Sequence, residues 1–182
     1  MKSKFLIAAS LAALIVPATS LGSPPSGQDR ANGARACRAL RASMGVELFR
    51  QSYGTAQANR MNAFGRCVSQ WTHRAHQLRM QARAACAAEQ ADASFAESHD
   101  GKSFDEFYGT GPQHRQALQN CVASKLQEAT SEAQSNTTNA AKECKAERAG
   151  MTAAEFRAKY GKNENDRNAF GKCVSQLAKA QA

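Results

Sequence analysis

The chain has 182 residues, enough for one domain or a short array of small ones, and its formal net charge is +9. It contains 37 Ala, but beyond residue 20 the Leu, Val and Phe residues together number only 18 and Ile is missing. This shortage of large apolar residues excludes a large α/β enzyme core and a buried parallel sheet, and it favours Ala-rich helices held together by cross-links.

The first twenty residues have the composition of an export signal. Two Lys residues precede an apolar run from Phe5 to Val16, and small residues follow at Ala18 and Ser20. This run is too short to cross a bilayer, so we expect a cleaved signal peptide rather than an anchor. Nothing downstream is long and apolar enough for a membrane span, so we expect a secreted or cell-envelope protein that is not membrane-spanning.

A threefold internal repeat organises the rest of the chain. Each copy has a Cys, an F-x-x-x-Y-G segment and a second Cys, and the first and third copies share N-A-F-G-[KR]-C-V-S-Q around the second Cys. The middle copy has Gln116-Ala117-Leu118-Gln119 in place of N-A-F-G and six extra residues near His99. A period of about 50 residues is typical of helical arrays.

The six Cys residues are expected to form three disulfides, because exported chains meet oxidising conditions. Cys67 and Cys86 are 19 residues apart on one predicted helix. That separation is about 28 Å, whereas a disulfide needs Cα atoms within about 7 Å. That distance excludes Cys67–Cys86. Because each copy has one Cys before its F-x-x-x-Y-G segment and one after it, the predicted pairs are Cys37–Cys67, Cys86–Cys121 and Cys144–Cys173. Free thiols or a metal site are the alternatives, but metal-ligand spacings such as C-x-x-C are missing.

Local signals place short helices within each repeat. The S/T-x-x-E pattern at Ser103 and at Thr152 predicts capping boxes that begin helices there. Gly54, Gly109 and Gly161 follow the repeated Tyr and are predicted as left-handed helix ends. The large side chains of the repeat are predicted to form the small core of each module: Phe49, Tyr53, Phe64, Phe104, Tyr108, Leu118, Phe156, Tyr160 and Phe170.

Long helices are predicted between the repeats. A heptad seam with 4-3 spacing runs from Phe64 through Trp71 and Leu78 to Ala85. A weaker seam runs from Leu118 to Ala133 and fades at residues 135–139, where a break or fraying is expected. The predicted fold is all-α, an array of three disulfide-stapled helical modules joined by long Ala-rich helices. The predicted segments are a signal peptide (1–20), a flexible leader (21–34), repeat 1 (35–71), a connecting helix (72–85), a diverged repeat 2 (86–124), a second connecting helix (125–143) and repeat 3 (144–182).

The C…F-x-x-x-Y-G…N-A-F-G-[KR]-C-V-S-Q pattern resembles repeats of uncharacterised secreted proteins from high-GC Gram-positive bacteria. It covers Cys37 to Gln70 and Cys144 to Gln176 well, and Cys86 to Ser124 poorly. The resemblance implies export and a modular architecture, and it implies no particular activity.

Motifs for catalysis are missing: the sequence has no nucleophile elbow, P-loop, dinucleotide fingerprint or zinc-protease helix. We therefore expect no enzyme activity, cofactor or metal. The His residues are weak candidates for a metal-binding or pH-sensitive site, and solvated surface residues are the favoured explanation for them. They are His73 and His76 on a predicted helix, His99 beside Asp100 in the insertion, and His114 beyond it.

Charge gives the one functional indication. Residues 24–86 hold ten Arg and no Lys against two acidic residues, whereas residues 87–182 hold 12 basic and 13 acidic residues. A basic N-terminal module attracts anionic polymers such as wall teichoic acids, lipid headgroups or extracellular nucleic acid, and Arg near Trp71 suits stacking. The alternative is that the charge only keeps a helix soluble. The candidate anion-binding residues are Arg35, Arg38, Arg41, Arg60, Arg66, Arg74, Arg79 and Arg83.

The sequence thus predicts a secreted, non-catalytic interaction or scaffold protein. The first alternative is a protease-resistant effector or inhibitor that acts on a protein partner through an exposed loop at residues 97–103. The second is a small enzyme or a metal or redox protein.

Overall fold

The computed structural model describes residues 23–55, 58–161 and 168–181, and the predicted signal peptide, 1–20, lies outside them. The described residues form seven α-helices and one short 3-10 helix, so the prediction of an all-α protein is confirmed. None of these helices is long and apolar enough to cross a membrane. The elements are α1 (Gly27–Met44), α2 (Val46–Tyr53), α3 (Ala63–Ala91), η2 (Phe95–Ser98), α4 (Phe104–Tyr108), α5 (Ala117–Ala149), α6 (Ala153–Tyr160) and α7 (Ala169–Ala180).

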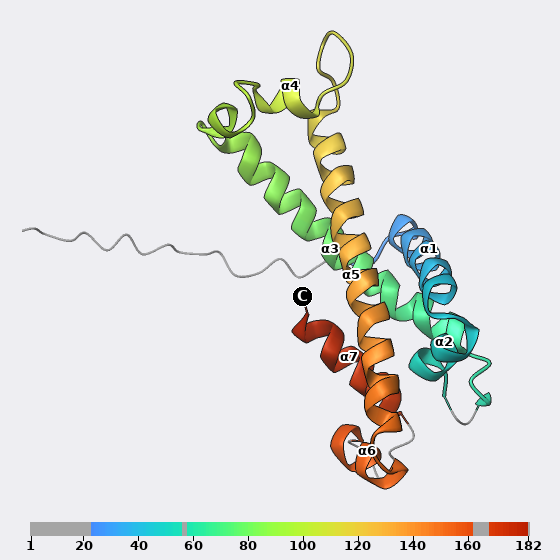
Figure 1. Cartoon of the computed structure of the whole chain (residues 1–182). Coiled ribbons are helices and arrows are strands. Elements are labelled where there is room, and N and C mark those ends of the chain that lie inside the picture. Colours follow the sequence, from blue (N-terminus) through green and yellow to red (C-terminus); the bar gives the residue numbers. More distant parts are fainter. Residues whose placement is uncertain (1–22, 56–57, 162–167, 182) are drawn as a thin grey trace, which may run out of the picture.

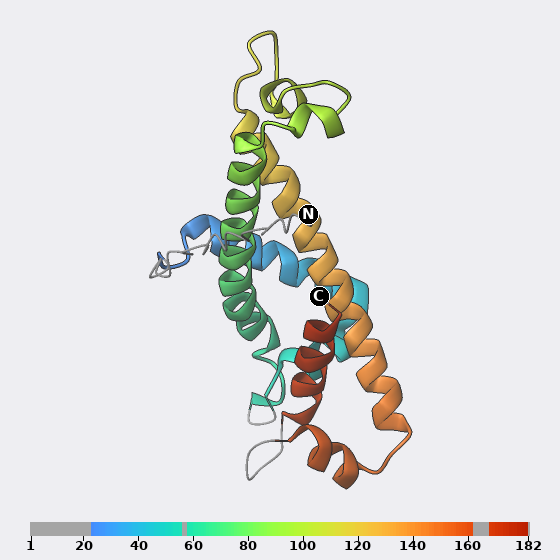
Figure 2. The ribbon, with the colours of Figure 1, turned by 90° about the vertical axis from the view of Figure 1, so that its left-hand side faces the viewer.

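Two long antiparallel helices, α3 and α5, form the frame of the molecule (Figure 1). Helix α1 crosses α3 on one side of this pair, and α7 lies along α5 on the other side (Figures 1 and 2). Elements η2 and α4 close the far end of the pair, away from α2, α6 and α7. The connecting helices predicted from the heptad seams are thus present as continuous parts of α3 and α5.

The three predicted disulfides are confirmed, with Cα–Cα distances of 5.9, 6.0 and 6.0 Å. Helix α3 carries Cys67 and Cys86, and α5 carries Cys121 and Cys144. Each long helix therefore holds the second Cys of one repeat and the first Cys of the next. Because an intact helix keeps these two Cys far apart, neither long helix can pair its own two Cys, and each bridge connects two different helices within one repeat.

The repeats do not form three equal modules. The first and third copies pack on one common set of buried residues, which we call the shared core. Residues 86–121 form a second module with a separate core around Phe95 and Phe104. Contact between copies is close where α7 meets α2, since a Cβ at Gly171 would lie 2.6 Å from the Ser52 carbonyl oxygen.

Small residues allow the helices of the shared core to approach closely. A Cβ at Gly33 of α1 would lie 2.8 Å from the backbone nitrogen of Thr72 in α3. Ala140 and Ala141 of α5 are completely buried. Such contacts pack the backbones tightly but remove little apolar surface from water, which matches the scarcity of large apolar residues in the sequence.

Helix α1 begins earlier than predicted. A flexible leader was expected over residues 21–34, but the chain is helical from Gly27 onward. Ser26 caps this helix: its hydroxyl accepts from the Asp29 N–H, and the Asp29 carboxylate accepts from the Ser26 N–H. This is a capping box with Asp in place of Glu, which the S/T-x-x-E pattern does not detect. The boxes predicted at Ser103 and Thr152 are both present.

Helix α5 is continuous through residues 135–139, so the predicted break is wrong. Its polar side chains are satisfied within the fold. The Thr137 hydroxyl donates to the Ala133 carbonyl oxygen at 2.7 Å, and the Thr138 hydroxyl lies 3.0 Å from the Ser43 hydroxyl of α1. Both Thr side chains are buried against neighbouring helices, and this packing outweighs their low helix propensity.

Two predicted core residues are exposed: Phe64 has 36% of its surface accessible and Leu118 has 39%. The reason is visible in the third repeat, where Phe170 is buried and its ring lies 6.3 Å from that of Phe156. Helix α7 is short and lies against its neighbours, whereas Phe64 begins a long helix on its outer side. In the seam, Ala85 is exposed and Cys86 is buried instead. The other predicted core residues are buried or, for Tyr108, half-buried.

The repeated glycines do not adopt left-handed conformations. Gly54, Gly109 and Gly161 have φ angles of −80°, −72° and −71°, so this prediction is wrong. Close approach explains two of them. A Cβ at Gly54 would lie 2.7 Å from the Cα of Arg60, and a Cβ at Gly109 would lie 2.5 Å from the His114 carbonyl oxygen.

Removing the disulfide of the second module should unfold that module selectively. Its core contains five buried residues, two of them the Cys themselves. In a Cys86→Ala/Cys121→Ala variant, the 35-residue separation corresponds to a loss of about 3–4 kcal/mol of stabilisation in the chain-entropy account. Hydrogen–deuterium exchange should accelerate over residues 92–117 and stay slow in α1 and α7.

The control is Cys144→Ala/Cys173→Ala, which removes a disulfide attached to the shared core. This variant should lower the melting temperature of the whole body. Exchange that rises equally throughout the Cys86→Ala/Cys121→Ala variant would contradict the division into two cores.

Candidate functional site

A groove of about 1010 Å³ runs between α3, α5 and α7, beside the end of α2. Four of its lining side chains are basic: Arg66, Arg74, Lys172 and Lys179. Glu132 is the one acidic side chain among the described residues that line it. A surplus of positive charge on a concave surface between low-dielectric helices concentrates the field and attracts anions.

Two of the basic residues occupy the same repeat position. Arg66 and Lys172 each directly precede the second Cys of their copy, and both line the groove because the two copies share one core. Arg66 is anchored there, since its Nε donates to the Tyr53 carbonyl oxygen at 3.1 Å. The second module has Asn120 at this position, which donates to the Tyr108 carbonyl oxygen at 2.8 Å and carries no charge.

Helix α3 presents opposite faces to α1 and to the groove. Thr72, His76 and Arg79 contact or face α1. Gln70, Arg74, Gln77 and Gln81 line the groove. At about 100° per residue these two sets are centred on directions roughly 180° apart. The groove face of α3 is therefore free of α1.

The floor of the groove contains a buried aromatic pair. The Trp71 indole N–H donates to the Tyr53 hydroxyl at 3.0 Å, and both side chains are buried. Burial raises the pKa of Tyr53 to about 12, so the phenol is neutral at physiological pH. The Arg74 guanidinium lies 5.6 Å from the centre of the Trp71 ring. The ring predicted to stack on a ligand is thus used inside the protein.

A second hollow of about 610 Å³ continues the groove toward the N-terminal segment. It shares His73, Gln77 and Gln81 with the first, and it extends to Pro24 and Pro25. The α3 residues of the second hollow, 73–81, lie within the stretch 66–81 that lines the first, so the second hollow extends the site around α3 toward residues 23–25.

The predicted Arg residues do not form one surface. Only Arg66 and Arg74 line the groove. Arg35, on α1, donates to the Asn32 side chain at 2.7 Å. The others that lie outside the groove are Arg38, Arg41, Arg60, Arg79 and Arg83. The candidate Arg residues are thus divided between the groove and other parts of the molecule, and α1 packs on the face of α3 opposite the groove.

Lys172 and Lys179 were not among the predicted binding residues. Basic and acidic residues balance over residues 87–182, so the third repeat has no surplus of charge that would indicate them. The equivalence of Lys172 with Arg66 is visible in the N-A-F-G-[KR]-C motif, but the sequence does not show that the two copies line one groove.

A repeated C-x-x-E pattern was also not recognised as a structural signal. Its acidic residues, Glu89 and Glu147, accept hydrogen bonds from the Tyr108 and Tyr160 hydroxyls at 3.0 and 2.7 Å.

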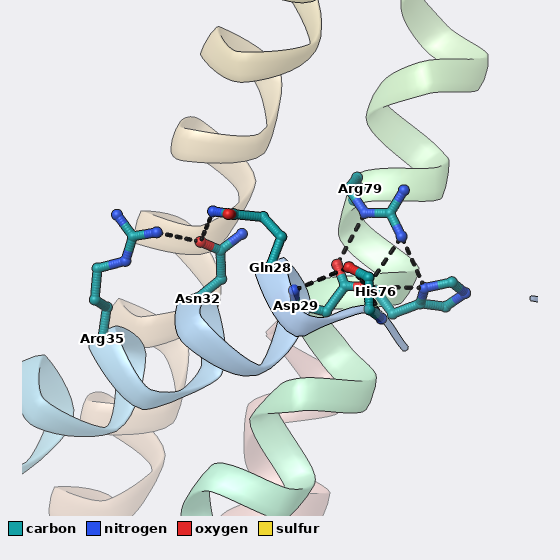
Figure 3. A network of polar contacts seen from close by, with 7 residues as sticks. Gln28, Asp29, Asn32, Arg35, His76 and Arg79 are labelled. Carbon is teal, nitrogen blue, oxygen red and sulfur yellow. Dashed lines mark hydrogen bonds and ion pairs between the residues drawn. The ribbon is translucent and has the colours of Figure 1, made fainter. Parts of the chain in front are cut away.

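A buried ion pair holds α1 against α3 (Figure 3). Asp29 is completely buried, and its carboxylate accepts from Arg79 Nε at 2.8 Å and Nη2 at 2.9 Å. The Arg79 guanidinium and the Ser26 donors hold the pKa of Asp29 far below its ordinary range, despite burial. His76 Nδ1 lies 3.2 Å from the same carboxylate. Arg79, predicted to bind an external anion, is therefore used within the fold.

This cluster does not have the connectivity of a nucleophile and its base. In a catalytic triad the imidazole lies between the hydroxyl and the carboxylate. Here the carboxylate of Asp29 lies between the Ser26 hydroxyl, at 2.8 Å, and His76. The arrangement caps α1 and ties it to α3.

The remaining His candidates do not converge. His99 stacks on Phe95 with ring centres 3.7 Å apart, and its Nδ1 lies 2.8 Å from the Phe95 carbonyl oxygen. Asp100 and His114 both lie in turns, with φ angles of 53° and 47°. Within the described residues no three His, Cys, Asp or Glu side chains are grouped to hold a metal ion.

The loop predicted at 97–103 is exposed at most of its positions, and it is folded back on the second module. The Gly101 N–H donates to the Ala96 carbonyl oxygen at 2.9 Å, and the stacked His99 holds this segment against Phe95. The loop that projects from the end of the molecule is 109–116, where Thr110 and Arg115 exchange two backbone hydrogen bonds (Figure 1).

Comparison of the chain with protein-family models, with curated proteins and with solved structures finds no match.

Replacing Asp29 with Asn tests the buried ion pair. The pKa of Asp29 is lower in the folded chain than in the unfolded chain, so its charge stabilises the fold above about pH 4, and this contribution is lost as pH falls further. Asp29→Asn should lower the free energy of unfolding by about 2–3 kcal/mol at pH 7. The difference from the wild type should shrink between pH 4.5 and pH 2, as measured by urea unfolding. Glu128→Gln, on the exposed face of α5, is the control and should change little. A difference that is constant down to pH 2 would contradict this role of the carboxylate.

Replacing Tyr53 with Phe tests the aromatic floor. The change leaves the Trp71 N–H buried without its acceptor, which should cost about 1–3 kcal/mol. Trp71 is the one Trp in the chain, so its fluorescence reports unfolding of the shared core directly. Tyr108→Phe is the matched control, because its half-buried hydroxyl belongs to the second module. Equal midpoints for Tyr53→Phe and the wild type would contradict a structural role for this hydrogen bond.

Proposed function

We propose that the protein is a secreted, non-catalytic binding protein that holds an anionic polymer of the cell envelope in the groove between α3, α5 and α7. The observation that carries this proposal is the convergence of basic side chains from two repeats on one concave surface. Arg66 comes from the first copy and Arg74 from the connecting part of α3 that follows it, while Lys172 and Lys179 come from the third copy.

The shape of the site supports a polymer. The two hollows share three lining residues and together reach from α7 around α3 to residues 23–25, so an extended chain can contact both. Acidic groups spaced along such a chain would meet successive basic side chains and release their counterions, which is a favourable and salt-dependent contribution to binding. Three disulfides fit an oxidising compartment outside the cytoplasm, where envelope polymers lie.

Charge reversal inside the groove should weaken binding strongly. For Arg74→Glu/Lys179→Glu, retention on heparin across a salt series should correspond to at least a tenfold loss of affinity, and the log–log salt slope should fall by about 2. Helix content and Trp71 fluorescence check that the variant is folded.

The matched control makes the same charge change outside the groove. Arg38→Glu/Lys145→Glu replaces two exposed basic side chains that do not line either hollow. The decrease in the logarithm of its binding constant should be less than half of the decrease seen for the groove variant. Equal losses for the two variants would mean that net charge, rather than the groove, retains the polymer, and the proposal would be wrong.

A further inference from the structure

We propose that the polymer recognised by the groove is an acidic polysaccharide. Sugar hydroxyls would bind the amide side chains of α3, and carboxylate or sulfate groups would bind the basic side chains around them. This inference rests on the proposed function and narrows it to one class of ligand.

Three amide side chains of α3 are available to a ligand in the groove. Gln70, Gln77 and Gln81 lie on the groove face, and within the described part of the chain their side chains form no hydrogen bond with the protein. A carboxamide offers two donor hydrogens and an acceptor oxygen, which matches a hydroxyl group that both donates and accepts. A site for bare phosphates would gain little from acceptor oxygens, because an ionised phosphate accepts hydrogen bonds but has no hydrogen to donate.

The amides and the basic side chains are interleaved along one helix face. Arg74 lies between Gln70 and Gln77, one turn from each, while Lys179 faces them from α7. A polymer that lies along α3 would therefore present hydroxyl and acidic groups in alternation. Sugar chains whose residues carry both groups have this chemistry.

The aromatic rings exclude the competing class of anionic polymer. Single-stranded nucleic acids are held by bases stacked on exposed aromatic faces. The groove is lined by Tyr53 and Trp71, which are 7% and 4% exposed. The Trp71 N–H is bound to Tyr53, and Arg74 lies over its ring. Neither ring offers a base a free face.

The continuation of the groove gives the site its length. Gln77 and Gln81 line both hollows, so they lie at the junction between the α7 side and the segment at Pro24 and Pro25. A chain that passes through this junction contacts the same two amides whichever way it continues. Removing these two side chains should therefore weaken polysaccharide binding more than removing other amides of the groove.

The test measures binding of the oxidised, mature protein to four probes in the same buffer: polygalacturonate, heparin, inorganic polyphosphate and poly(dT). The variant is Gln77→Met/Gln81→Met, which keeps side-chain length and helix propensity but removes the hydrogen-bonding groups. Gln90→Met/Gln127→Met makes the same change at two exposed positions outside both hollows and serves as the control.

We expect the groove variant to lose about tenfold in affinity for both polysaccharides and less than twofold for polyphosphate, with the control unchanged. A response to only one polysaccharide would identify the carboxylate or the sulfate as the acidic group and would still support the proposal. Equal losses for polyphosphate and polysaccharides, or no loss for any probe, would overturn it.

Two other outcomes separate this inference from the proposed function. Binding of poly(dT) as tight as that of the polysaccharides, with Arg74→Glu/Lys179→Glu still weakening it, would overturn the polysaccharide assignment and leave the anionic-polymer function standing. If none of the four probes binds the wild type, the proposed function fails and the inference fails with it.

Discussion

Helices α3 and α5 run without a break from one disulfide to the next, and the positions of the other elements follow from that continuity. The first disulfide attaches α1 near the start of α3, the second joins the far ends of the two long helices, and the third attaches α7 near the end of α5. Because α3 and α5 are antiparallel, the first and third copies of the repeat meet at one end and the second is left alone at the other. Three similar copies in the sequence thus form two unequal parts of the structure.

The close helix contacts explain how the chain folds with so few large apolar side chains. Gly33 lets α1 approach the α3 backbone, and buried Ala residues on α5 allow similar proximity. Such packing gains dispersion energy but buries less apolar area than a core of Leu and Ile would. The disulfides and the buried ion pair of Asp29 and Arg79 then specify which helices pack together, which the close packing of small residues alone does not. Helix α1 covers only one side of α3, and the groove lies on the face of α3 that is free of α1.

Local signals in the sequence predicted the helices, their capping boxes at Ser103 and Thr152, and the disulfide pairs, because each depends on residues near one another in the chain or on a helix of fixed rise. Burial was predicted less well, since it depends on which copy a helix packs against: Phe64 and Phe170 share a motif but differ in exposure. Of the groove's basic residues, Arg66 and Arg74 were among those predicted. Their combination with Lys179 depends on the meeting of two distant copies, which no local pattern encodes.

The placement of the three disulfides also determines what a single cut in the backbone can do. Every connection between helices, from Gly45 to the segment before α7, lies inside one of the spans 37–67, 86–121 and 144–173. A peptide bond broken in any of these connections leaves two fragments that are still joined by a sulfur bridge. The spans between the bridges, 67–86 and 121–144, lie within α3 and α5, where a protease must first unwind the helix. The molecule can therefore be nicked at its exposed turns and remain one covalent piece until it is reduced.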